Sequence, residues 1–132
     1  MNELRPMPWR ECLTLLRSTP VGRLVFTEDA LPAIRPVNFV VRGTDIIVRT
    51  SRGGTLSKIA GEVVAFEADE VDPHTHTGWS VVAVGKAEPV TDIDELADLA
   101  DPAWRPWAPG DRSHFLRIQI ELVNGRRLAP AA

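Results

Sequence analysis

The sequence has little of several features that would assign it to a specialised class of protein. Its single cysteine, Cys12, excludes an intramolecular disulfide, which fits a reducing compartment. No apolar run approaches the roughly 20 residues that cross a bilayer, and the first residues contain no apolar signal core. The formal net charge of −3 argues against general nucleic-acid binding, which needs a basic surface. These absences predict a cytoplasmic protein that binds neither membrane nor nucleic acid.

The remaining composition is that of an ordinary globular protein. Hydrophobic residues make up 44% of the 132 residues and charged residues make up 25%. A chain of this length is expected to form a single domain, residues 1–132, with a substantial core. We interpret Cys12 as a small core residue, because no activating pattern surrounds it.

The hydrophobic pattern predicts six strands and three short helices. Strands are expected at residues 21–27, 33–41, 46–50, 62–71, 79–90 and 116–122, and helices at 8–18, 55–61 and 92–100. The first loops are too short for crossovers, which favours an antiparallel meander. Gly85 predicts a bend or bulge, and Thr91 or Asp92 can cap the last helix. The expected fold is mainly β, a closed or split six-stranded antiparallel β-barrel with short helices.

The corner at residues 46–61, where a strand turns into a short helix, is the first candidate site. Its polar residues are Arg49, Thr50, Ser51, Arg52, Thr55, Ser57 and Lys58, placed around two glycines. Backbone N–H groups at a helix start and cationic side chains both favour an anion, so the corner predicts a phosphate seat. A tight turn with solvated charges explains the same residues, because no strict phosphate-loop motif is present. Spacing alone leaves both interpretations open.

Six segments, taken in order, resemble one protein family. They are residues 22–26, 32–41, 46–56, 64–72, 77–90 and 106–118. Together they make residues 9–128 similar to the pyridoxamine 5′-phosphate oxidase-like flavin-binding split-barrel proteins, especially the small bacterial and actinobacterial members. The resemblance implies a six-stranded split barrel that forms a homodimer, with two FMN sites at the dimer interface.

The resemblance also implies which residues contact the cofactor. The strand with Arg35, Pro36, Val37 and Asn38 is expected to run along the isoalloxazine ring. The phosphate is expected at the corner that holds Arg49, Thr50, Ser51, Arg52, Thr55 and Lys58, and the neighbouring subunit is expected to contribute Trp79 and Ser80. Close relatives often carry lysine at the position of Thr55, so this chain departs from the family pattern at one phosphate contact.

Each assignment has a structural alternative. Proline cannot donate a ladder hydrogen bond, so Pro36 is expected at a sheet edge or bulge with or without a ligand. Trp79 is as well explained by ordinary burial. His74 and His76 superficially suggest a metal pair, but no clear third ligand accompanies them, and we expect no metal site.

The expected function is that of an FMN-dependent oxidoreductase acting on a small molecule. No convincing serine–histidine–acid or metal-ligand set is present, so the cofactor would supply the chemistry. The same site also suits a reductase that uses the deazaflavin F420, with Arg42, Arg52 and Lys58 as cations, or a non-catalytic ligand-binding protein. We expect negligible oxidation of pyridoxamine phosphate, because only Arg126 and Arg127 represent a C-terminal basic segment.

Overall fold

The computed structural model describes residues 2–50, 54–100 and 114–130. These residues form seven strands, β1 (Asn2–Met7), β2 (Val21–Glu28), β3 (Leu31–Arg42), β4 (Asp45–Thr50), β5 (Val63–Asp72), β6 (Thr77–Pro89) and β7 (His114–Pro130). They also form two α-helices, α1 (Trp9–Leu16) and α2 (Ile93–Leu99), and a 3₁₀ helix, η1 (Thr55–Ile59). No helix within these ranges is long and apolar enough to cross a membrane.

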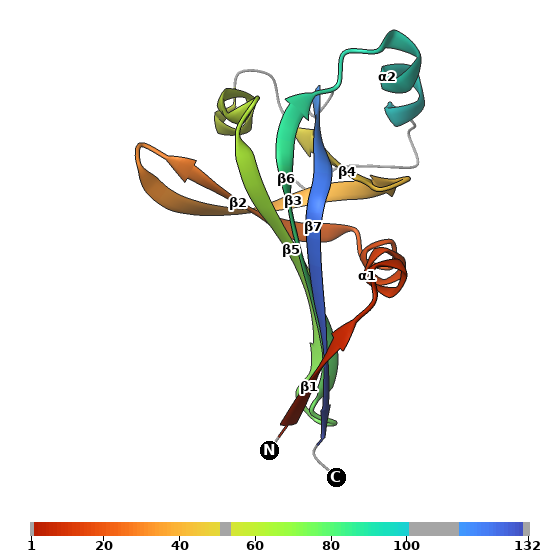
Figure 1. The fold of residues 1–132 in the computed structure, drawn as a ribbon. Helices are drawn as coiled ribbons and strands as arrows, with labels where there is room; N and C mark the ends of the chain where they lie inside the picture. The colour runs from red at the N-terminus through yellow and green to blue at the C-terminus, as the bar shows by residue number, and fades with distance from the viewer. Residues whose placement is uncertain (1, 51–53, 101–113, 131–132) are drawn as a thin grey trace.

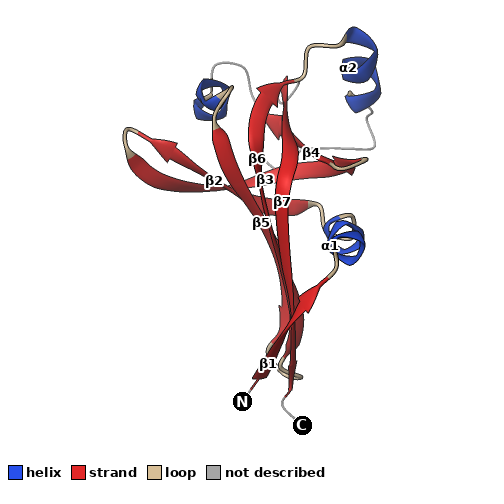
Figure 2. Cartoon of the chain, viewed as in Figure 1, coloured by secondary structure: helices blue, strands red, loops and turns tan. Residues whose placement is uncertain are grey.

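The strands form one antiparallel sheet that closes on itself. Their order is β1-β7-β4-β3-β2-β5-β6, and β6 also pairs with β7, so β2 to β7 form a six-stranded ring. Beyond the ring, β1 and the adjoining ends of β5, β6 and β7 continue as a narrow extension, which we call the stalk (residues 2–7, 68–72, 77–81 and 125–130; Figures 1 and 2). The predicted fold class, a mainly β antiparallel barrel with short helices, is confirmed.

Alternating apolar side chains of the strands fill the barrel. Leu24, Ile46 and Phe66 are fully buried, and the rings of Phe39 and Phe66 meet edge to face with their centroids 4.6 Å apart. A Cβ atom on Gly22 would lie 2.2 Å from Cζ of Phe66, so only glycine leaves room for this ring. The core is therefore built from the inward side chains of strands that are far apart in sequence.

A smaller apolar cluster attaches α2 to the outside of the barrel. It contains Ile47, Val90, Leu99 and Phe115, all buried. Next to it, Arg117 on β7 pairs with Asp45 on β4 through an N–O distance of 2.7 Å, and also with Glu95 on α2. The hydrogen bond to Glu95 is the largest cause that raises the pKa of Arg117, and Asp45 adds to it against the opposing effect of burial. Helix α2 is thus held by both apolar and ionic contacts.

Several local predictions are confirmed. The β6–β7 register shifts between Val84 and Gly85, and a Cβ atom on Gly85 would lie 2.0 Å from the carbonyl oxygen of Gln119, which explains the glycine at this bulge. The Glu95 backbone N–H donates to Asp92 Oδ2 over 2.9 Å, so Asp92 caps α2. Cys12 is fully buried, and burial raises the pKa of its thiol.

Two strand predictions were wrong in extent. The sequence pattern predicted the last strand at residues 116–122, but β7 extends from His114 to Pro130. The pattern also left residues 2–7 unassigned, whereas they form β1, which pairs with residues 125–130 of β7. Both stretches have little apolar alternation, and backbone pairing with a neighbouring strand makes them extended.

Candidate functional site

The first two thirds of β3 form a sheet edge. Strand β2 pairs with residues 31–38 of β3, but β4 pairs with β3 only at residues 39–42. In the described part of the chain, residues 31–38 are therefore the edge on the β4 side. Arg35 and Pro36 are exposed there, whereas Val37 and Asn38 are buried, at 7% and 8% relative exposure. The predicted position of Pro36 at an edge is confirmed, and an edge of this kind offers backbone groups to a ligand.

The end of β4 lies next to this edge. Continuing the β3–β4 register would set Val37 opposite Thr50 and Asn38 opposite Arg49, but the pairing stops at Phe39 and Val48. On the other side of β4, residues 49 and 50 continue its pairing with β7, opposite Phe115 and His114. The structure thus brings together two of the groups that the sequence predicted, the Arg35–Asn38 segment and the Arg49–Thr50 corner.

Within the corner, the side chains differ in their surroundings. The guanidinium carbon of Arg49 lies 5.4 Å from the centroid of the Phe115 ring, in cation–π contact, and Thr50 is 3% exposed. Ser51 and Arg52 lie outside the described residues, as does the side chain of Thr55, whose backbone begins η1. Arg49 is therefore the cation that the structure fixes at this corner.

Lys58 lies at the other end of η1. Its exposed side chain borders a cavity of about 200 Å³ between η1 and the β2–β3 turn. The rim of this cavity also carries Glu28, Asp29 and Glu62, which were not predicted as site residues. No sequence motif marks these acids, because they come from segments more than 30 positions apart.

Trp79 and Ser80 lie on the stalk, away from the corner. In register they face Glu70 and Asp69 on β5, and Arg127 and Arg126 on β7. Trp79 is 7% exposed and belongs to the main hydrophobic core, while Ser80 is half-buried. A single chain therefore does not bring these two residues to the edge of β3.

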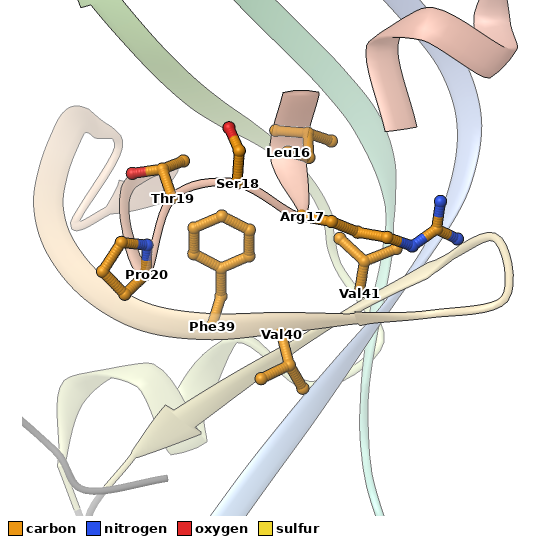
Figure 3. Close-up of a pocket in the computed structure, with 8 residues that line it drawn as sticks. All are labelled: Leu16, Arg17, Ser18, Thr19, Pro20, Phe39, Val40 and Val41. Carbon is orange, nitrogen blue, oxygen red and sulfur yellow. The ribbon is translucent and has the colours of Figure 1, made fainter. Parts of the chain in front are cut away.

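A second cavity, of about 350 Å³, lies between the end of α1 and the second half of β3. Figure 3 shows the Phe39 ring facing residues 17–20, with the Arg17 side chain extending past Val41. Arg17 Nη2 donates to the Gly43 carbonyl oxygen over 3.1 Å, which ties this segment to the β3–β4 turn. The walls of this second cavity contain none of the predicted site residues. They offer apolar surface and no acid, base or nucleophile beyond the Ser18 and Thr19 hydroxyls, which donate to the carbonyl oxygens of Leu15 and Val21.

The outer face of the barrel contains one strongly perturbed acid. Arg23 Nη1 lies 2.7 Å from Glu67 Oε1 and 3.5 Å from Asp69 Oδ2. Burial first, and then the hydrogen bond and charge of Asp69, raise the pKa of Glu67 to about 6 against the opposing effect of Arg23. Among the described residues, no group of three or more histidine, cysteine or acidic side chains is arranged to hold a metal ion.

Among the described residues, a closed six-stranded barrel whose β3 strand pairs with β4 only at residues 39–42 defines a split-barrel protein. The chain matches the family model of pyridoxamine 5′-phosphate oxidase over residues 8–127, and it belongs to that family. The uncharacterized protein Rv0080 of Mycobacterium tuberculosis is 41% identical over 124 residues, which cover 89% of this chain and 81% of that protein.

Solved structures agree with this assignment. The FAD binding protein from Mycobacterium smegmatis is 31% identical, with a TM-score of 0.74 over 95% of this chain and 98% of that one. A FAD-binding protein from Mesorhizobium loti is 25% identical, with a TM-score of 0.75 over 94% of this chain and 97% of that one. The family and the barrel architecture are therefore shown by sequence and by structure.

Proposed function

We propose that this chain binds a flavin at the β3 edge and uses it to exchange a hydride or electrons with a small molecule. The observation that carries the proposal is the position of residues 31–38, which pair with β2 but not with β4, beside Arg49 and Thr50 at the end of β4. Two further findings support flavin binding: the chain belongs to the family, and two proteins of similar structure are described as FAD-binding. An isoalloxazine ring needs hydrogen-bonding groups along one side, and a strand edge supplies them at regular spacing.

The residues of the site would hold the flavin in two parts. The backbone of residues 35–38 would contact the ring system, with buried Val37 and Asn38 fixing the strand beneath it. Arg49 and Thr50 would contact the phosphate of the FMN moiety, where a guanidinium and a hydroxyl are both donors. The flavin supplies the redox chemistry when bound, so these residues bind and orient it, and no protein base is required.

We further propose that the functional unit is a homodimer. The register aligns Ile34, Val25, Ala65, Val84 and Leu122 in one row across β3, β2, β5, β6 and β7. The two ends of this row are strongly exposed, Ile34 at 65% and Leu122 at 68%. A contiguous apolar row on the outside of a barrel is typical of an interaction surface.

The neighbouring row favours a second copy of this chain as the partner. It carries both signs of charge, with Arg23 next to Glu67 and Asp69. A two-fold axis brings identical patches together, so a patch with both signs can complement itself. Ile34 and Pro36 lie on this face and also on the β3 edge, which places the proposed interface beside the proposed flavin site. Ser80 lies on the same outer face, so a partner could contribute it.

Titration of the purified protein with flavins tests the proposal. We expect quenching of flavin fluorescence at micromolar FMN or FAD, with F420 binding more weakly. Arg49→Ala should weaken flavin binding by about tenfold or more, through the loss of a charge-assisted contact. Arg10→Ala, on the exposed face of α1, is the matched control.

Two outcomes would contradict the proposal: no binding of either flavin at micromolar concentration, or a clear preference for F420. Because Arg49 also contacts Phe115, the thermal unfolding of Arg49→Ala must be compared with that of the wild type. A variant that melts like the wild type but has lost flavin affinity assigns the residue to the ligand.

A further inference from the structure

The cavity between η1 and the β2–β3 turn has a composition that the proposed FMN contacts do not explain. Its interior is apolar, with Phe26 and Ile59 buried at 4% and 3% exposure. Its rim is charged, with one ammonium group on Lys58 and the carboxylates of Glu28, Asp29 and Glu62. The site therefore combines a hydrophobic wall with one cation and several hydrogen-bond acceptors.

The position of the cavity relates it to the β4 corner. Helix η1 is the next described element after β4 in the chain, and it begins at Thr55 and ends at Ile59 on the cavity wall. A 3₁₀ helix rises about 2 Å per residue, so the two ends of η1 lie roughly 8 Å apart. Glu62 is fixed at the far end, because its backbone N–H donates to the Ile59 carbonyl oxygen over 3.0 Å. A ligand that extends from Thr55 along η1 therefore reaches this cavity.

The chemistry of the rim selects among possible continuations. Carboxylates accept hydrogen bonds from ribose hydroxyls and from an exocyclic amino group, as an acidic residue does for ribose in dinucleotide-binding folds. A single ammonium group suits one further phosphate, and the apolar wall suits the face of a purine ring. A polyanionic tail, in contrast, carries more negative charge than one ammonium group can balance. Repulsion from the three carboxylates therefore disfavours it.

We propose that this cavity binds the adenosine half of FAD, with Lys58 contacting the second phosphate. This inference rests on the proposed flavin site, and it makes FAD the preferred cofactor over FMN. Lys58 is then reassigned from the phosphate shared by both flavins, where sequence comparison placed it, to the phosphate that only FAD has. Glu28 and Glu62 accept hydrogen bonds from the sugar or the base.

Two variants test the cavity without changing residues 35–38, the segment proposed to contact the ring system. Lys58→Met removes the cation, and Thr27→Trp places a large side chain at an exposed position on the cavity wall. The dissociation constants of FAD and FMN are measured for each variant by flavin fluorescence. Lys86→Met, which changes the chain's other lysine, and Thr91→Trp, at an exposed loop position, are the matched controls.

We expect wild-type protein to bind FAD about tenfold more tightly than FMN, which corresponds to one charge-assisted contact. Each cavity variant should remove most of that difference and leave FMN affinity within about twofold, and the controls should keep it. Equal affinities in the wild type, or a parallel loss of FAD and FMN binding in Lys58→Met, would overturn the inference and leave the flavin site standing. Failure of the wild type to bind either flavin would overturn the flavin site as well.

Discussion

The two faces of the barrel wall contrast sharply, although the same strands supply both. On β5, Phe66 points inward and is fully buried, while its neighbours Ala65 and Glu67 point outward. The inward residues are enclosed by the chain's own closed sheet. The two ends of the outward apolar row, Ile34 and Leu122, stay exposed among the residues that the structure describes. The comparison shows that the inner face accounts for folding, and it suggests that the outer face serves association.

The largest effect is expected from a change on the inner face. Phe66→Ala removes the ring that contacts Phe39 and leaves a cavity in a closed core, so the free energy of unfolding should fall by about 3–5 kcal/mol. Urea denaturation measures this change. Val82→Ala, on the outer face of the neighbouring strand, should cost less than about 1 kcal/mol. Equal losses of unfolding free energy for the two variants would show that the inner face contributes no more to stability than the outer face.

A charge in the outer row should act on association instead. Leu122→Asp places a carboxylate at an exposed position of the apolar row, and we expect it to weaken the proposed dimer by at least about 100-fold. Light scattering should then report the 14.5 kDa mass of one chain. Thr44→Asp, in the exposed β3–β4 turn, should keep twice that mass. A wild type with the mass of a single chain would rule out the dimer.

A smaller effect is expected where α2 is attached to the barrel. Arg117→Ala breaks the partly buried ion pairs with Asp45 and Glu95 and should lower the free energy of unfolding by about 1–3 kcal/mol. A double-mutant cycle with Glu95→Gln separates the α2 contact from the β4 contact. A coupling energy near zero would show that the apolar cluster alone holds α2.

The smallest effect is a pH dependence on the outer face. The pKa of Glu67 is raised to about 6 from an ordinary value of 4.5, so the folded state favours its neutral form. This contribution to stability is complete below pH 4.5 and is lost as the pH rises through 6. Glu67→Gln keeps a neutral side chain, so wild type should lose about 1 kcal/mol relative to the variant across this range.

Thermal unfolding of both proteins between pH 4 and 7.5 measures the difference. The Leu122→Asp background keeps association from contributing to the result. A stability difference that stays constant with pH would show that the pKa of Glu67 is not raised on folding. Glu70→Gln, which changes an exposed carboxylate on the same strand, is the control for the loss of a charge.

Local features of the fold were predictable because their causes are local. Alternation of apolar residues predicted the six strands of the barrel, a glycine inside a strand predicted the bulge at Gly85, and a capping residue predicted the start of α2 at Asp92. Strand β1 was not predicted, because its pairing with residues 125–130 depends on a segment more than 100 positions away. Glu28, Asp29 and Glu62 around the η1 cavity were also not predicted, because they come from distant segments of the chain.

The sequence by itself determined which residues are apolar or polar at each strand position, where turns and caps fall, and which family the chain resembles. Only the tertiary structure decided which part of β3 is an edge and that Trp79 lies in the core. It also decided that Ile34 and Leu122 lie at the two ends of one outward apolar row. Pattern within a strand depends on near neighbours in the chain. Edges, rows and cavities depend on the register between distant strands, which is fixed only when the barrel closes.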